Sequence, residues 1–139
     1  MKVNQLVSKL VFGLFVSAAS FAVCAQSMKV TLSGAQEVPP VMTSASGMGS
    51  IMVSSDGAIS GNVTTTGVEV TMAHIHLAPM GQNGPVIVPF AKTADNVWSV
   101  PAGAKLTDAQ LQSLKSGDLY INVHSAANKG GEIRAQLKP

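Results

Sequence analysis

From about residue 28 onwards, apolar and polar positions alternate along most of the chain, and short groups of Gly, Pro, Asn and Ser separate the alternating segments. A period of two is typical of β-strands that bury one face of a sheet. The pattern predicts strands at residues 28–33, 48–54, 58–66, 69–77, 85–90, 96–100, 118–124 and 131–137. About eight short strands with frequent turns favour an all-β fold, and we expect an antiparallel, Greek-key-like β-sandwich.

The segment LTDAQLQSLKSG breaks this alternation. Thr107 is a suitable helix N-cap, and Gln110, three residues later, can reach back to the backbone of the cap. Gly117 can end the helix in a left-handed conformation. The segment therefore predicts one short helix near residues 108–116, crossing between strands.

The N-terminus has the organisation of a secretory signal peptide. Lys2 and Lys9 lie ahead of an apolar run from Leu10 to Val23, and the small residues that follow suit cleavage after Ala25. The run is short for a bilayer span, and no charged stop-transfer segment follows it. We therefore expect residues 1–25 to be a cleaved signal peptide.

Removal of the signal peptide changes the chemistry open to the chain. Two of the nine basic residues leave with it, so seven basic and seven acidic residues remain. A chain with no net charge, one Trp and one Tyr lacks the basic surface and stacking aromatic residues that nucleic-acid binding requires. The only cysteine, Cys24, also leaves, which excludes disulfides and thiolate metal sites. We expect a single exported domain at residues 26–139, periplasmic or secreted, with no membrane span. Acylation of Cys24 and an uncleaved anchor are the alternatives.

Three of the predicted strands each place an aliphatic set on one side and polar side chains on the other. The aliphatic set, which belongs in the core, comprises Ala73, Ile75, Leu77, Leu119, Ile121, Val123, Ile133, Ala135 and Leu137. Successive strand residues point to opposite faces, so His74, His76 and His124 are all directed outward. If the three strands share a sheet, the outer face that carries the three histidines also carries Asn122, Glu132 and Arg134.

Three neutral imidazoles on one face suit copper or zinc and leave an open coordination position. Met72, two residues before the first histidine on the same face, adds a soft thioether that would favour Cu(I), and Met80 in the following loop could do the same. Ligating histidines usually donate their second ring nitrogen to a carboxylate or carbonyl, so Glu132 or Asn122 could support the site.

A purely structural interpretation of the same residues is also open. The histidines could hydrogen-bond to Glu132, Asn122 and backbone groups, and so hold strands and loops together. Glu132 and Arg134 share a strand face in the predicted pattern, which favours an ion pair that organises the turn SAANKGGE. Methionines more often fill cores than bind metals.

Several motifs resemble the CHRD family, a domain named after chordin and also found singly in exported bacterial proteins. They are LSGAQEVPP, then AHIH followed by NGPV, then GDLYINVHSAANKGGEIRAQL, and together they span residues 28–137. The resemblance implies a β-sandwich module without an established activity.

A looser resemblance is to copper-zinc superoxide dismutases, β-sandwiches that bind copper through an H-x-H pair on one strand and a histidine on a late strand. It implies His74, His76 and His124 as ligands, with Arg134 steering an anion. For the predicted sandwich itself, a superoxide dismutase-like and an immunoglobulin-like arrangement are both open. That enzyme's bridging histidine, zinc ligands and disulfide have no counterpart here. A shared sandwich does not by itself transfer function.

Two functions follow from these observations. The first, which we favour, is an exported binding or structural module that can hold copper or zinc; the sequence identifies no protein partner. The second is a small copper-dependent redox enzyme. No catalytic residues are predicted, because there is no G-x-S-x-G motif and Ser125 faces away from the adjacent His124.

Overall fold

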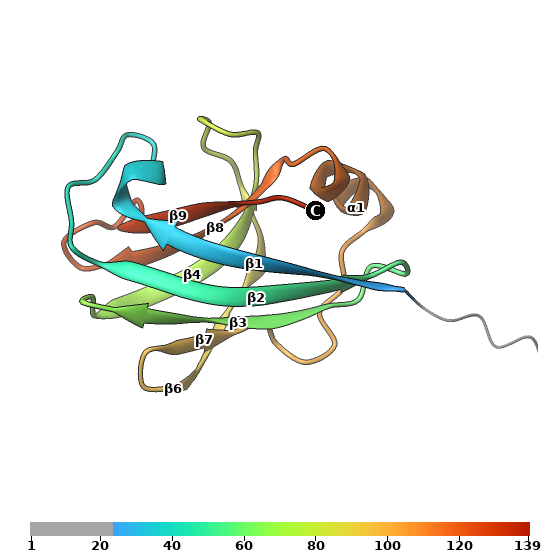
Figure 1. Cartoon of the computed structure of the whole chain (residues 1–139), viewed down its shortest axis with the longest axis horizontal. Helices are drawn as coiled ribbons and strands as arrows, with labels where there is room; N and C mark the ends of the chain where they lie inside the picture. Colours follow the sequence, from blue (N-terminus) through green and yellow to red (C-terminus); the bar gives the residue numbers. More distant parts are fainter. Residues whose placement is uncertain (1–23) are drawn as a thin grey trace, which may run out of the picture.

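The computed structural model describes residues 24–139, so nearly all of the expected signal peptide lies outside the described residues. The strands are β1 (Ala25–Ser33), β2 (Ser46–Ser54), β3 (Ile59–Thr66), β4 (Val70–Leu77), β5 (Val86–Pro89), β6 (Ala91–Ala94), β7 (Val97–Ser99), β8 (Leu119–Ser125) and β9 (Ile133–Leu137) (Figure 1). A 3-10 helix, η1 (Gly34–Gln36), follows β1, and an α-helix, α1 (Asp108–Lys115), precedes β8. All eight predicted strands form, and the all-β prediction is confirmed.

The sequence pattern missed β6. Its residues read AKTA and all four are exposed, so no alternation marks the strand. It forms because it pairs with β7 at one end of the sheet.

The strands form one antiparallel sheet in the order β5-β4-β8-β9-β1-β2-β3-β7-β6. The two end strands, β5 and β6, are separated by a single residue in the chain, so the sheet comes almost full circle. The pairing of β9 with β1 is limited to Ser33 and Arg134. This short junction divides the sheet into a four-stranded and a five-stranded part, and the two parts enclose the core.

The core consists of the side chains that the strands direct inward. Of the predicted core set, eight residues are buried and Leu77 is partly buried. From the five-stranded part, Leu32, Ile51 and Val63 are fully buried in the same cluster. The alternating pattern therefore identified the inner faces correctly.

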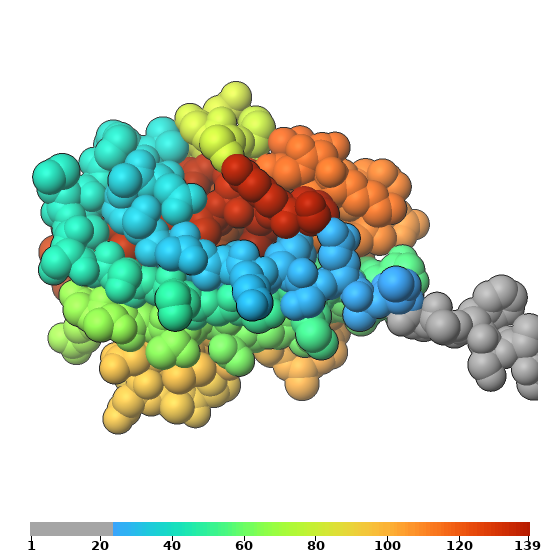
Figure 2. Space-filling model, viewed as in Figure 1, coloured from blue at the N-terminus to red at the C-terminus, as the bar shows by residue number. Residues whose placement is uncertain are grey.

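The opposite face of β8 and β9 is not exposed, contrary to the sequence-based expectation. All seven residues of β8 are buried, including Tyr120, Asn122 and His124. The loop after β4 and the segment between β1 and β2 cover this face; in Figure 2 the loop lies above the red C-terminal segment and the cyan segment between β1 and β2 lies to its left. The two segments are joined by a hydrogen bond of 2.8 Å from Asn83 Nδ2 to the Val38 carbonyl.

Helix α1 begins with the predicted capping box. The Gln110 backbone N–H donates to Thr107 Oγ1 at 3.2 Å, and the Thr107 N–H donates to Gln110 Oε1 at 2.9 Å. Gly117 follows with a positive φ of 79°. Among residues 24–139, no helix has the length and apolarity that crossing a bilayer requires.

Candidate metal centre

The three histidines lie together on the covered face of the sheet. In the antiparallel register of β4 and β8, Met72 is opposite His124, His74 is opposite Asn122, and His76 is opposite Tyr120. One ring nitrogen from each histidine can be chosen so that all three lie within 4.8 Å of one another. Nitrogens on a tetrahedral copper or zinc ion lie about 3.4 Å apart, so small side-chain movements would complete a three-nitrogen site.

Backbone carbonyls fix the orientation of two of the rings. His76 Nδ1 lies 2.9 Å from the Gly84 carbonyl oxygen, and His124 Nδ1 lies 2.8 Å from the Lys129 carbonyl oxygen. A carbonyl only accepts, so each Nδ1 carries the proton and each Nε2 keeps a free lone pair. His124 Nε2 lies 3.1 Å from His74 Nδ1, which can donate to it when no ion is bound.

His76 Nε2 is buried and has no hydrogen-bond partner. An unpaired buried nitrogen is costly, and the lone pair of a neutral imidazole is a metal ligand. The groups that orient His76 and His124 are backbone carbonyls. Of the two predicted supporting residues, Glu132 hydrogen-bonds elsewhere, whereas the side chain of Asn122 acts on His76 in the direction that raises its pKa.

The environment favours the uncharged form of His74 and His76. Desolvation, together with the neighbouring His124 and His76, lowers the pKa of His74 from 6.5 to about 4. Desolvation is also the largest cause that lowers the pKa of His76. Metal ligation requires neutral imidazole, so these two rings are already in the required protonation state at neutral pH.

The methionines differ in their relation to the cluster. Met72 is half exposed and lies across from His124 in the register of β4 and β8, where side chains share a face. Met80, which the sequence suggested as a second soft ligand, lies in the loop after β4 and lines a separate pocket.

Arg134 and Tyr120 hold the loop that orients His76. The His76 and Tyr120 rings stack with centroids 4.8 Å apart and planes 5° apart, and Arg134 Cζ lies 3.4 Å from the centroid of the Tyr120 ring. Arg134 donates to Asn83 Oδ1 at 3.1 Å and to the Gln82 carbonyl at 2.7 Å. The Tyr120 hydroxyl accepts from the Gly84 N–H.

This placement does not suit the anion-steering role predicted for Arg134. Its side chain is 1% exposed, and its guanidinium hydrogen-bonds to the loop after β4. A charge that attracts anions from solution has to be displayed to solvent. Arg134 is therefore placed to position the loop.

Glu132 does not form the predicted ion pair with Arg134. Its carboxylate accepts hydrogen bonds from Thr43 Oγ1 at 2.6 Å, Ser125 Oγ at 2.5 Å and Asn128 Nδ2 at 2.7 Å. These bonds, led by the one from Ser125, lower the pKa of Glu132. Glu132 therefore organises the turn between β8 and β9 as a hydrogen-bond acceptor.

Glu37 is a buried acid that the sequence analysis included only within the motif LSGAQEVPP. It is 4% exposed, and desolvation raises the pKa of its carboxyl from 4.5 to about 7 against the opposing effects of Arg134 and Asn122. Glu37 Oε1, Asn122 Oδ1 and His76 Nε2 are the buried side-chain atoms of residues 24–139 that lack a hydrogen-bond partner. The glutamate in LSGAQEVPP was the available signal, because it is the one ionisable residue in this stretch.

The fold and the cluster define a small antiparallel β-domain with three histidines gathered on one covered face. The family model for the CHRD domain matches residues 28–137. The chain therefore belongs to the CHRD domain family. Comparisons with curated proteins and with solved structures gave no significant match.

Proposed function

We propose that this CHRD domain is an exported module that binds one copper or zinc ion through His74, His76 and His124. The observation that carries the proposal is the buried, unpartnered His76 Nε2, in a cluster where one ring nitrogen each of His76 and His124 lie within 4.8 Å of each other and of one from His74. Both rings are held by carbonyl groups in the tautomer that presents Nε2 as a ligand. Hydrogen bonds that orient a ligand in advance reduce the ordering cost of metal binding.

Copper is the metal that the donor set favours. Imidazole sites of this kind bind Cu²⁺ more tightly than Zn²⁺ in the usual order of divalent affinities. Met72 offers a thioether beside His124, and such soft ligands favour Cu(I). Zinc remains compatible with three imidazoles and an open fourth position.

Binding is proposed in preference to redox catalysis. A superoxide-processing site would need a group that guides the anion, and the residue predicted for this role, Arg134, is buried under the loop after β4. Three imidazoles, two of them oriented by backbone carbonyls, are sufficient for holding an ion.

Export is part of the proposal. Residues 1–25 have the charge and apolar pattern of a signal peptide, and Gln26 and Ser27, just after the expected cleavage site, already pair with β2. Intact-mass measurement on protein recovered from a periplasmic fraction would test this. A chain that begins at Gln26 supports cleavage, whereas acylated Cys24 at the N-terminus would show lipid anchoring.

The metal proposal is tested by titrating tag-free protein, residues 26–139, with Cu(II), Cu(I) and Zn(II). We expect one ion per chain and a rise in unfolding free energy of about 2.7 kcal/mol when the free metal is a hundredfold above its Kd. His74→Ala should remove most of this binding while circular dichroism shows an intact fold. Metal affinity that does not change with His74→Ala would refute the site.

A matched pair of methionine variants tests the thioether. Met72 and Met48 are both exposed strand residues, but Met48 lies on β2 and pairs with β1 and β3. Met72→Ala should weaken Cu(I) binding and leave Zn(II) binding unchanged, and Met48→Ala should affect neither. Equal effects of the two substitutions would exclude Met72 as a ligand.

A further inference from the structure

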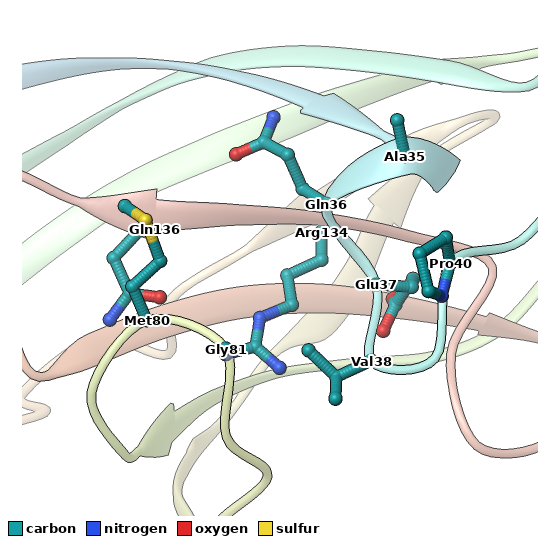
Figure 3. Close-up of a pocket in the computed structure, with 9 residues that line it drawn as sticks. All are labelled: Ala35, Gln36, Glu37, Val38, Pro40, Met80, Gly81, Arg134 and Gln136. Atoms are coloured by element: carbon teal, nitrogen blue, oxygen red, sulfur yellow. The ribbon is translucent and has the colours of Figure 1, made fainter.

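A second site lies beside the metal centre, between η1 with the residues after it and the loop after β4. It is a pocket of about 340 Å³ over β9. The lining residues are Ala35, Gln36, Glu37, Val38, Pro40, Met80, Gly81, Arg134 and Gln136 (Figure 3). Small-molecule sites of this size typically combine apolar walls with a few convergent polar groups. The pocket has this composition, because Ala35, Val38, Pro40 and Met80 surround a floor of Glu37, Arg134 and Gln136.

The charge of Arg134 is not matched by an ionised partner. Its hydrogen bonds go to a backbone carbonyl and a side-chain amide, and its guanidinium also lies over the Tyr120 ring. Neither ion pair found within 4.0 Å in residues 24–139 includes Arg134. Glu37 is the acid whose charge acts on it, and burial keeps that carboxyl partly protonated at neutral pH, since its pKa is about 7. Arg134 is too buried to draw an anion in from bulk solvent, but a buried cation without a fully charged partner stabilises an anion that enters the pocket it lines.

We propose that this pocket binds a small organic carboxylate, with the carboxylate group against the guanidinium of Arg134 and the apolar body against Ala35, Val38 and Met80. A planar carboxylate matches the fork of N–H donors on a guanidinium. The apolar walls favour an organic anion over inorganic phosphate. The proposal goes beyond metal binding and does not depend on it, because none of the three histidines lines the pocket.

The test uses benzoate as the probe, with its near-isosteric neutral analogue benzamide and inorganic phosphate as comparisons. Metal-free protein, residues 26–139, is titrated at about pH 6 and followed by two-dimensional NMR. Tyr120, the only tyrosine in the chain, lies under Arg134 and reports on the pocket floor. We expect saturable shifts at Tyr120 and in residues 35–38, with benzoate binding at least about tenfold tighter than benzamide or phosphate. Equal affinity for benzoate and benzamide would overturn the proposal.

Two tryptophan variants localise the ligand. Ala35 is exposed on η1 at the pocket wall, so Ala35→Trp should fill the pocket and weaken benzoate binding by about tenfold or more. Ala94→Trp places the same side chain on exposed β6, away from the lining residues, and should leave binding unchanged. Both variants should retain the wild-type melting temperature. Undiminished benzoate binding by a folded Ala35→Trp protein would place the ligand elsewhere.

The pH dependence gives an independent check. When Glu37 is ionised, it competes with the ligand for the positive charge of Arg134. Arg134 is the charged group that acts on Glu37; the other groups that face Glu37, the Asn122 side chain and the Val38 N–H, are neutral. Benzoate binding should therefore weaken severalfold between about pH 6 and pH 8, and Glu37→Gln should remove this dependence. Shifts confined to His74 and His124, or a pH dependence that persists in Glu37→Gln, would contradict the assignment.

Discussion

Replacing Glu37 by Gln should stabilise the protein at alkaline pH, although Glu37 is buried and part of a CHRD motif. The carboxyl is 4% exposed, and desolvation raises its pKa from 4.5 to about 7. The carboxamide of Gln has the same shape and carries no charge. The substitution therefore removes the cost of ionising a buried acid and keeps the packing.

The magnitude follows from the linkage between protonation and folding. A raised carboxyl pKa means that the folded chain holds its proton over a pH range in which the unfolded chain has already lost it. Stability therefore falls as pH rises from about 4.5 to about 7. At about 1.4 kcal/mol per pKa unit, the total loss is about 3 kcal/mol. Glu37→Gln should be nearly neutral at about pH 4.5 and more stable than wild type by about 3 kcal/mol at about pH 8.

Urea unfolding of metal-free protein, followed by the fluorescence of the single Trp98, measures this difference at each pH. His74 and His76 contribute in the opposite direction, because their pKa values are lowered; for His74, stability rises between about pH 4 and pH 6.5. Their contribution is the same in both proteins and cancels in the comparison. Glu69→Gln, at an exposed acid, serves as the control. A stability difference between Glu37→Gln and wild type that does not change with pH would refute the reasoning.

Three further predictions concern single residues. Gly131→Ala should lower the unfolding free energy by about 2 to 4 kcal/mol, because the new Cβ would lie 2.5 Å from Glu37 Oε1 at a backbone φ of 134°. Gly130→Ala, whose Cβ meets open space, should lower it by less than about 1 kcal/mol. Equal losses in the two variants would contradict the steric explanation. In metal-free protein, ¹⁵N NMR should show His74 still neutral at about pH 5.5, since burial and its histidine neighbours lower its pKa to about 4; a midpoint near 6.5 would be incompatible. Thr107→Ala should cost about 1 kcal/mol in urea unfolding through loss of the capping box, and an unchanged midpoint would count against it.

The elements that the sequence predicted are those with a strong local signal. Alternation in the segment that became β8 located both the strand and its core set, and Thr107 with Gln110 located the start of α1. β6 escaped because its four residues are exposed and show no alternation. It exists through pairing with β7, which is a tertiary contact.

For the candidate site, too, the sequence predicted the features with a local signal and missed those that depend on distant residues. That His74, His76 and His124 share a face follows from strand periodicity, and the register of β4 and β8 brings them together. The partners of Glu132 and Arg134 could not be predicted, since Thr43 and Asn83 lie 89 and 51 residues away in the chain. Because Glu132 and Arg134 share a strand face, the sequence suggested an ion pair between them. In the structure each hydrogen-bonds instead to residues that are more distant in the chain.

Strand positions, the helix cap and the common face of the histidines depend on neighbours within a few residues, so the amino-acid pattern is sufficient for them. Burial of that face is different. It requires two loops, joined between Asn83 and Val38, to fold over β8 and β9. The same covering brings the Gly84 carbonyl to His76, leaves His76 Nε2 unpartnered and raises the pKa of Glu37. These properties depend on desolvation and on backbone groups of distant segments, which a local pattern of side chains does not encode.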